Sequence, residues 1–140
     1  MPLALIAPNA FKGSLSAGAA ARFLARGLLS ALPGVRLDLM PVSDGGDGLM
    51  EVLLARAGGR SVSCAALDAL GRPGRAPYAL LYDGLAVVEM ARASGIARLG
   101  GAALDPLGAT SYGTGQLIAA ALRRLRDPHT SGECAFRMPS

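Results

Sequence analysis

The first third of the chain alternates between short apolar runs and segments with helical spacing. Residues 3–7 form an apolar run that stops at Pro8, which predicts a buried strand. After a polar loop, apolar side chains recur at helical spacing over residues 20–31. Ser16 is a candidate amino-terminal cap for this helix, and Pro33-Gly34 is a typical end.

The same order of elements then repeats. Residues 35–42 alternate well enough to predict a second strand, and a glycine-rich loop follows at residues 43–48. Apolar positions over residues 50–57 predict a second helix that ends at Gly58-Gly59. Two strand–loop–helix units in succession predict a parallel α/β layer, with both loops at the carboxyl ends of their strands.

The middle of the chain has a different pattern. Three runs, at residues 61–67, 76–82 and 85–90, predict strands separated by turns at residues 71–74 and at Asp83-Gly84. Asp-Gly between two apolar runs is a strong hairpin signal. The parallel layer is therefore expected to pass into an antiparallel patch of a second α/β domain.

The predicted domain boundaries follow this change. Residues 1–62 are interpreted as a Rossmann-like or flavodoxin-like α/β segment. Residues 63–126 are interpreted as a partial second α/β domain that ends in a helix beginning near Gly113. Residues 127–140, which include His129 and Cys134, show neither helical nor strand periodicity.

The composition of the chain argues against several classes of protein. The chain has 140 residues, of which 51% are hydrophobic and 17% charged, so it is not intrinsically disordered. No run of 18 apolar residues and no basic leader occurs, which predicts neither a membrane span nor a signal peptide and favours the cytoplasm. Cys64 and Cys134 are too few for a disulfide scaffold or a zinc site, and Cys64 is expected to be a small core residue.

The net charge of +4 raises the question of nucleic-acid binding. The arginines are scattered and only six residues are aromatic, so neither a basic stripe nor a stacking platform is present, and no nucleic-acid partner is expected. Thirteen of the fourteen basic residues are arginine, and Lys12 is the one lysine. This choice indicates that a compact ammonium group is wanted at position 12.

Lys12 lies in the first candidate loop, residues 8–16, between a predicted strand and a predicted helix. The loop combines a cation, the hydroxyls of Ser14 and Ser16 and the backbone N–H groups of a helix start, which suits phosphate or carboxylate. It lacks the Walker pattern. The alternative is an ordinary loop with a serine cap.

The second candidate loop is SDGGDG at residues 43–48. Gly45 and Gly46 allow the backbone to approach a ligand closely, and Asp44 and Asp47 offer two carboxylates. Such a pair can bind Mg²⁺ or orient a hydroxyl group. The alternative is a turn whose aspartates cap the next helix.

The third candidate loop opens the last helix and is rich in glycine and hydroxyl groups. Its N–H groups and the helix dipole favour an anion, although a simple helix cap is an equal alternative. Glu89 closes an apolar run and is either a site residue or a structural partner. The candidate residues of this loop are Thr110, Ser111, Gly113, Thr114 and Gly115.

The order of these motifs is more specific than any one of them. The chain reads APNAFKGSLSA, PVSDGGDGLMEVL, LDALGRP, VVEMARASG and DPLGATSYGTGQLI, at residues 7–17, 41–53, 67–73, 87–95 and 105–118. This succession resembles the bacterial type I glycerate kinase family. The resemblance covers residues 1 to about 126.

The resemblance implies ATP-dependent, Mg²⁺-dependent phosphorylation of D-glycerate on a fold of two α/β domains. Lys12 would then hold an anionic group, Asp44 or Asp47 would bind Mg²⁺ or orient the hydroxyl, and the loop at residues 110–115 would cradle an anion. A second possibility is a truncated, non-catalytic module that binds anions or another protein. The sequence does not indicate an oligomeric state.

The chain departs from the family pattern in two respects. The family usually reads APDSFKGS in the first loop, where this chain has Asn9 and Ala10, and Leu49 stands where the family often has threonine. Family members are also more than twice as long, and the segment after Arg126 does not match them. The fold is therefore expected to be incomplete, through truncation or a frameshift near residue 126.

Overall fold

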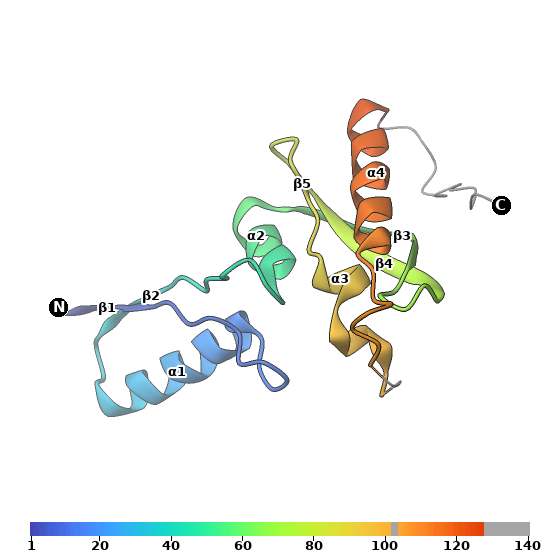
Figure 1. The fold of residues 1–140 in the computed structure, drawn as a ribbon. Helices are drawn as coiled ribbons and strands as arrows, with labels where there is room; N and C mark the ends of the chain where they lie inside the picture. Colours follow the sequence, from blue (N-terminus) through green and yellow to red (C-terminus); the bar gives the residue numbers. More distant parts are fainter. Residues whose placement is uncertain (102–103, 128–140) are drawn as a thin grey trace. The chain divides into compact units, whose positions relative to one another are not determined.

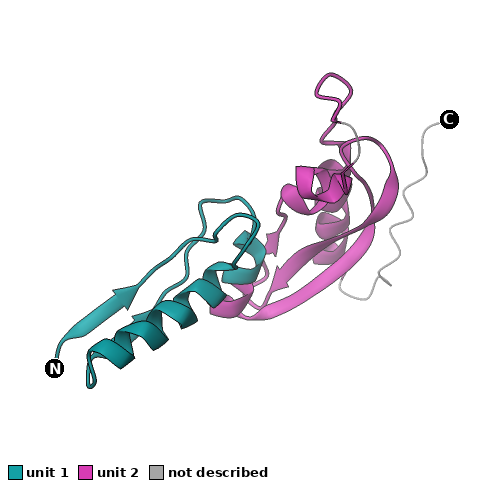
Figure 2. Ribbon diagram, turned by 90° about the horizontal axis from the view of Figure 1, so that it is seen from below, with its two compact units in different colours: residues 1–52 teal, residues 53–140 magenta. Residues whose placement is uncertain are grey.

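The computed structural model describes residues 1–101 and 104–127, and it divides the chain into two compact units. Unit 1 is Met1–Val52 and unit 2 is Leu53–Ser140, as coloured in Figure 2. The division falls earlier than the predicted boundary between residues 62 and 63. The tail from residue 128 onward, with His129 and Cys134, lies outside the described residues.

Unit 1 contains a parallel pair of strands with one helix packed on it (Figure 1). Strand β1 (Leu3–Ile6) leads through a loop to helix α1 (Ala17–Ala31), which returns the chain to strand β2 (Arg36–Leu39). The strands pair from Leu3 opposite Arg36 to Ile6 opposite Leu39. The predicted parallel layer is confirmed, although its second strand is shorter than residues 35–42.

Local chemistry sets the ends of α1. The Ser16 hydroxyl accepts a hydrogen bond from the Ala19 N–H at 3.3 Å, which satisfies one of the free amides of the first turn. The helix ends at Leu32, immediately before Pro33-Gly34. Small side chains on its inner face let it lie close to the sheet, so the core of unit 1 is built from Ile6, Ala21 and Ala25.

Helix α2 (Leu49–Ala57) contains the division between the units and leads into an antiparallel sheet in unit 2. The sheet has the order β3-β4-β5. Two short helical segments and one long helix follow it. The elements are β3 (Gly59–Leu67), β4 (Pro73–Leu81), β5 (Ala86–Val87), α3 (Ala91–Ser94), the 3₁₀ helix η1 (Ile96–Leu99) and α4 (Tyr112–Arg126).

The core of unit 2 lies between the sheet and the helices. Helix α4 contacts all three strands, and α3 contacts β3, β4 and α4 (Figure 1). Cys64 is 1% exposed within this core, as expected for a small core residue. The other buried members of the core are Ala66, Ala76, Tyr78, Ala93, Leu117, Ala120 and Ala121.

Several predicted boundaries in unit 2 were wrong. Pro73 begins β4, so the turn lies at residues 68–72 instead of 71–74. The run at 85–90 contributes only Ala86–Val87 to the sheet, and the short helix α3 was not expected. The hairpin at Asp83-Gly84 was predicted correctly, with Gly84 at a φ of 87° that favours glycine. Across residues 1–101 and 104–127, no helix is long and apolar enough to cross a membrane.

Candidate functional site

The first two candidate loops start side by side in unit 1. Beyond the strand ends, Met40 N donates to Ile6 O at 2.9 Å and Val42 N donates to Pro8 O at 3.1 Å. The parallel pairing thus continues into the loops and places Asn9 near Asp44. This is the carboxyl edge of the sheet, where α/β proteins commonly bind ligands.

Asp44 is held by its own loop and by the neighbouring one. Its Oδ1 accepts from Gly46 N at 3.1 Å. This backbone hydrogen bond, together with one from the Asn9 side chain, lowers the pKa of Asp44 below its ordinary value. The lowered pKa makes Asp44 a weaker base, so this carboxylate is better suited to contact a cation than to act as a general base.

The remaining groups of the second loop shape its turn. The Ser43 hydroxyl accepts from Gly45 N at 3.2 Å, and Gly45 has a φ of 95° that a side chain would strain. Asp47 lies exposed in the same turn. Proteins usually hold Mg²⁺ through one or two carboxylates while substrate phosphates complete its shell, and a role of Asp44 and Asp47 in holding this ion stays a prediction. Within the described part of the chain, no cluster of three or more His, Cys, Asp or Glu residues is placed to bind a metal.

Lys12 lies in a tight turn that an isolated β-bridge between Phe11 and Leu15 closes. Phe11 N donates to Leu15 O and Ser14 N donates to Phe11 O, each at 2.9 Å. The Ser14 hydroxyl also donates to Phe11 O at 3.2 Å, so it stabilises the turn. Lys12 is exposed. The start of α1 is a separate feature from this turn, because Ser16 caps it.

The third candidate loop is anchored in unit 2 by contacts with the end of β3. Gln116 Oε1 accepts from Leu67 N at 2.8 Å, and Thr110 N donates to Ala69 O at 2.9 Å. Gly113 packs against the Leu67 carbonyl so closely that a Cβ would overlap the oxygen. The absence of a side chain at Gly113 therefore has a packing reason, in addition to any role toward a ligand.

The start of α4 has no hydrogen bond from a side chain at its cap position, whereas the Ser16 side chain caps the start of α1. We call the start of α4 open for this reason. Ser111 occupies the cap position but makes no capping hydrogen bond. The Thr110 hydroxyl accepts from Tyr112 N at 3.1 Å, and the Thr114 hydroxyl lies 2.9 Å from that of Ser94 on α3. The first turn of α4 is therefore held in place by its neighbours, while the side chain at its cap leaves backbone amides available.

Glu89 is buried in unit 2, with 2% of its surface exposed. Its Oε1 accepts from Arg92 Nε at 3.0 Å, within the segment that leads into α3. Because a buried carboxylate needs a partner, this ion pair accounts for the residue structurally. A role of Glu89 toward a ligand stays a prediction.

A further carboxylate, Asp68, organises the turn between β3 and β4 and was missed in the sequence. Its Oδ1 accepts from Leu70 N at 2.8 Å and Arg72 N at 2.9 Å, and its Oδ2 pairs with Arg72 Nε at 2.5 Å. Burial opposes ionisation of Asp68, but these hydrogen bonds and the guanidinium charge outweigh it and lower its pKa. The signal was present as Asp-x-x-Gly-Arg in LDALGRP.

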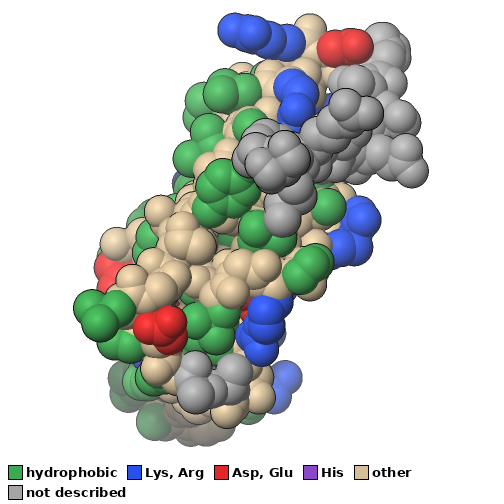
Figure 3. Space-filling view, turned by 45° about the vertical axis from the view of Figure 1, so that its right-hand side comes forward, with side chains coloured by type: hydrophobic (Ala, Val, Ile, Leu, Met, Phe, Trp, Pro, Cys, Tyr) green, Lys and Arg blue, Asp and Glu red, His purple; other side chains and the backbone are tan. Residues whose placement is uncertain are grey.

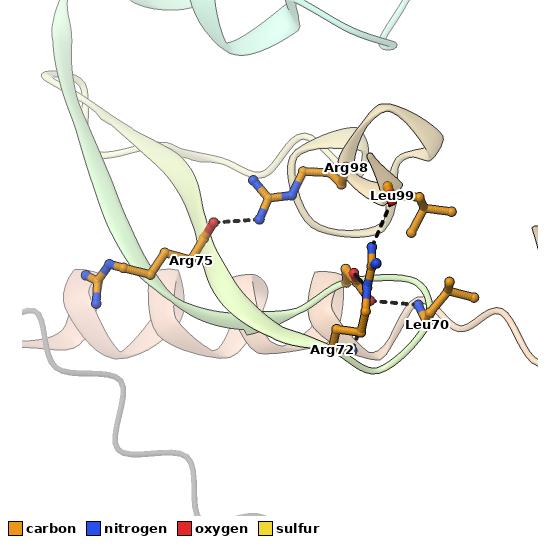
Figure 4. Close-up of polar contacts among 6 residues, drawn as sticks. Leu70, Arg72, Arg75, Arg98 and Leu99 are labelled. Atoms are coloured by element: carbon orange, nitrogen blue, oxygen red, sulfur yellow. Dashed lines mark hydrogen bonds and ion pairs between the residues drawn. The ribbon is translucent and has the colours of Figure 1, made fainter. Parts of the chain in front are cut away.

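Two arginine side chains, those of Arg72 and Arg98, link this turn and the start of β4 to η1. Figure 4 shows the Arg72 guanidinium reaching the Leu99 carbonyl at 3.2 Å, while Arg98 donates to the Arg75 carbonyl at 2.7 Å. Basic side chains are spread over the face drawn in Figure 3, and apolar side chains lie between most of them. The arginines near this turn therefore serve the fold of unit 2.

The structure thus places the predicted residues in two groups. Unit 1 holds Lys12, Ser14, Asp44, Gly45, Gly46 and Asp47, and unit 2 holds Glu89, Thr110, Ser111, Gly113, Thr114 and Gly115. Within each group, hydrogen bonds join segments that are distant in sequence. The residues of unit 1 lie in loops as predicted, whereas Gly113, Thr114 and Gly115 lie in the first turn of α4 and Glu89 lies between β5 and α3 instead of in the predicted strand. Their roles toward ligands stay predictions.

Comparison with known proteins identifies the family. The profile of the glycerate kinase family matches residues 4–127. The chain is 43% identical over 119 residues to glycerate kinase from Bacillus subtilis, covering 84% of this chain and 31% of that protein. It is 37% identical over 119 residues to glycerate 2-kinase from Escherichia coli, with the same coverage.

A solved structure agrees with these sequence matches. A putative glycerate kinase 2 from Salmonella typhimurium superposes with a TM-score of 0.69 and 38% identity, covering 88% of this chain and 33% of that one. The chain spans about a third of the length of the relatives it matches. The match over residues 4–127 shows that this chain belongs to the glycerate kinase family.

Proposed function

We propose that this chain supplies one part of a glycerate kinase, which transfers a phosphoryl group from ATP to D-glycerate. The family match over residues 4–127 carries the proposal, because the matched region contains every candidate loop. Phosphoryl transfer needs groups that position two anions and stabilise charge on the transferred group. Both units offer such groups on loops that the fold holds in place.

In unit 1, Lys12 would bind an anionic oxygen of glycerate or phosphate. Its exposed ammonium lies in a turn that other residues stabilise, so it has no structural duty that competes with binding. Asp44 would act in its ionised form, by accepting a hydrogen bond from the substrate hydroxyl or by helping to hold Mg²⁺ with Asp47. When bound, Mg²⁺ would neutralise charge on the phosphates.

In unit 2, the start of α4 would bind an anion through the backbone N–H groups of Gly113 and Thr114, since Gly115 N already donates to Ser111 O at 3.2 Å. The absence of a side-chain cap at Ser111 supports this role, since those amides are left for a ligand. The Thr114 hydroxyl, beside that of Ser94, adds a further donor.

A chimera tests the function directly. Residues 4–127 of this chain would replace the matched segment of the B. subtilis glycerate kinase, and ADP formation would be measured with D-glycerate, L-glycerate or no acceptor. We expect ADP formation that depends on D-glycerate. A folded chimera without such activity would overturn the proposal, provided that the parent enzyme is active in the same assay.

The same chimera tests the residues. Lys12→Ala should lower kcat/KM by about 10² or more, as expected when an electrostatic contact to the transition state is lost. Asp44→Asn and Asp47→Asn should keep the turn but lose Mg²⁺-dependent turnover. Arg22→Ala, on the exposed side of α1, is the matched control and should leave the kinetics unchanged. Near-normal kinetics in all three site variants would limit these loops to a structural role.

The second candidate is a non-catalytic module that binds anions or another protein. The matched region spans about a third of each relative, so this region by itself contains one part of the family's fold. We expect the 140-residue chain alone to show no ADP formation that depends on D-glycerate. Turnover by the isolated chain would reject this second candidate.

A further inference from the structure

The Asn9 side chain links the two candidate loops of unit 1. Beyond the paired strands, Val42 N donates to Pro8 O at 3.1 Å, so the first residues of both loops run side by side. Asn9 follows Pro8 directly, is exposed, and forms a side-chain hydrogen bond with the exposed carboxylate of Asp44. None of the roles proposed above for the loops of unit 1 uses Asn9, although it contacts a carboxylate on which they depend.

The polarity of this hydrogen bond follows from the groups on each side. Asn9 Oδ1 accepts from Ala10 N at 2.8 Å, so the first loop already engages the oxygen of this amide. An ionised carboxylate only accepts hydrogen bonds, so the Asn9 NH₂ group must be the donor to Asp44. An aspartate at position 9 could accept from Ala10 N in the same way, but it could not donate to Asp44.

The Asp44 carboxylate therefore has donors from both loops. Gly46 N donates to Asp44 Oδ1 at 3.1 Å from within the second loop, and the Asn9 amide donates from the first. The hydrogen bonds from Gly46 and Asn9 lower the pKa of Asp44, as expected when donors act on the charged form. Because Asn9 and Asp44 are both exposed, their contact adds little to the stability of unit 1, and its main consequence is the direction of the carboxylate.

We propose that Asn9 is a positioning residue that orients the Asp44 carboxylate for phosphoryl transfer before a cation or a substrate binds. An exposed aspartate without such contacts samples several staggered side-chain rotamers, whereas donors from two loops select one of them. A group that orients a functional carboxylate without touching the substrate commonly contributes about ten- to hundredfold to metal affinity or activity. The task of Asp44 in this inference rests on the proposed function, but its orientation by Asn9 does not.

NMR of the full chain in the presence of EDTA tests the orientation without using activity. The couplings between Hα and the Hβ protons of Asp44 report its side-chain rotamer. We expect one dominant rotamer in the unsubstituted chain and averaged couplings in both Asn9→Ala and Asn9→Asp, because each variant lacks the donor. Arg22→Ala, on the exposed side of α1, changes the net charge by the same amount as Asn9→Asp and should leave the Asp44 couplings unchanged.

A double variant tests whether the contact itself selects the rotamer. In Asn9→Asp/Asp44→Asn, the side chain at position 44 becomes the donor and the one at position 9 becomes the acceptor. The backbone hydrogen bonds from Ala10 N and Gly46 N keep their acceptors, and the net charge equals that of the unsubstituted chain. We expect the residue at position 44 to return to one dominant rotamer.

Kinetics of the chimera described above separate a positioning role from a purely structural one. Asn9→Ala should lower kcat about tenfold, because a smaller fraction of the enzyme holds Asp44 in the productive direction. The KM for D-glycerate should change by less than about threefold, since Asn9 does not itself bind the substrate in this proposal. Arg22→Ala again serves as the control and should leave both constants unchanged.

Three results would overturn the inference. The first is an Asp44 side chain whose couplings are the same in the unsubstituted chain, in Asn9→Ala and in Asn9→Asp. The second is averaged couplings in the double variant, because the restored hydrogen bond would then not select the rotamer. The third is an unchanged kcat for Asn9→Ala in an active chimera. An inactive unsubstituted chimera would count against the proposed function, and the NMR comparison alone would then decide the orientation of Asp44.

Discussion

The two units hold their candidate loops by different means. In unit 2, the loop before α4 is fixed by contacts between segments distant in sequence, such as Gln116 with Leu67 and Thr110 with Ala69. In unit 1, most hydrogen bonds within the loops join residues two to four positions apart and are exposed to solvent. The core beneath them is small.

This difference has consequences for stability and for binding. Buried hydrogen bonds are costly to break because the separated groups lose their partners without gaining water, whereas exposed ones exchange with water at little cost. Unit 2 therefore presents a preorganised candidate loop that tolerates few substitutions. Unit 1 presents loops that keep their shape through turn chemistry and that, outside their positive-φ glycines, accept substitutions readily.

Two glycines in the first turn of α4 give the strongest test of preorganisation in unit 2. Gly113→Ala should destabilise the unit by about 3 kcal/mol, because the new Cβ would overlap the Leu67 carbonyl oxygen. Gly115→Ala should stabilise it by about 1 kcal/mol, because the Cβ would enter open space in a helix. Denaturant unfolding followed by circular dichroism measures both. Equal effects would mean that α4 does not rest on β3.

The next prediction compares the loss of stability when a buried hydrogen bond in unit 2 or an exposed one in unit 1 is removed. Gln116→Leu should cost about 2 kcal/mol, since the Leu67 N–H would be left buried without its acceptor. Ser43→Ala removes the exposed bond from Gly45 N in unit 1 and should change stability by less than about 0.5 kcal/mol. The same unfolding experiment compares them. A loss from Ser43→Ala as large as that from Gln116→Leu would contradict the contrast.

The sequence predicted the elements that local rules determine. Helix α1 has a serine cap, an apolar face and a Pro-Gly end, all within its own segment, and the Asp83-Gly84 hairpin is equally local. The short helix α3 was missed because four residues are too few to show a helical period. Its position depends on contacts with β4 and α4, which no local pattern records.

The candidate site shows the same difference between features that local sequence determines and features that depend on contacts between distant segments. The loops were located from their glycines, hydroxyls and carboxylates, but the groups that hold them were not. Gln116 looks like any polar residue on a helix, and Gly113 was interpreted as a candidate anion-binding glycine at the start of the helix, not as a packing position. Their roles depend on the end of β3, about 45 residues earlier in the chain, and only the fold brings these segments together.

Replacing the serine at the start of each long helix compares how much side-chain capping stabilises α1 and α4. Ser16→Ala should destabilise α1 by about 1 kcal/mol, because its hydroxyl accepts from Ala19 N. Ser111→Ala should have less than about 0.5 kcal/mol of effect, since Ser111 makes no capping bond. Hydrogen exchange of amides in each helix reports the two changes separately. If Ser111→Ala loosens α4 as much as Ser16→Ala loosens α1, then the start of α4 is not open.

The smallest expected effects are changes in the pKa values of two carboxylates, one in each unit. The pKa of Asp44 is lowered by the Gly46 N–H and by the Asn9 side chain, whereas that of Asp68 is lowered by Arg72 and Leu70 against the opposing effect of burial. For both, a folded pKa below the unfolded value means that the stabilisation is present above the unfolded pKa. It is lost as the pH falls through the folded pKa.

Changing Asn9 should separate these two carboxylates. Asn9→Ala should raise the pKa of Asp44 by removing a donor, and Asn9→Asp should raise it further by adding a like charge beside it. Neither change should affect the pKa of Asp68, which is held within its own turn. Titration of the carboxyl carbons by NMR between about pH 2 and 7 covers the range around the ordinary aspartate pKa and measures both sites in one sample. An unchanged Asp44 titration in Asn9→Asp would show that the two loops of unit 1 do not meet in solution.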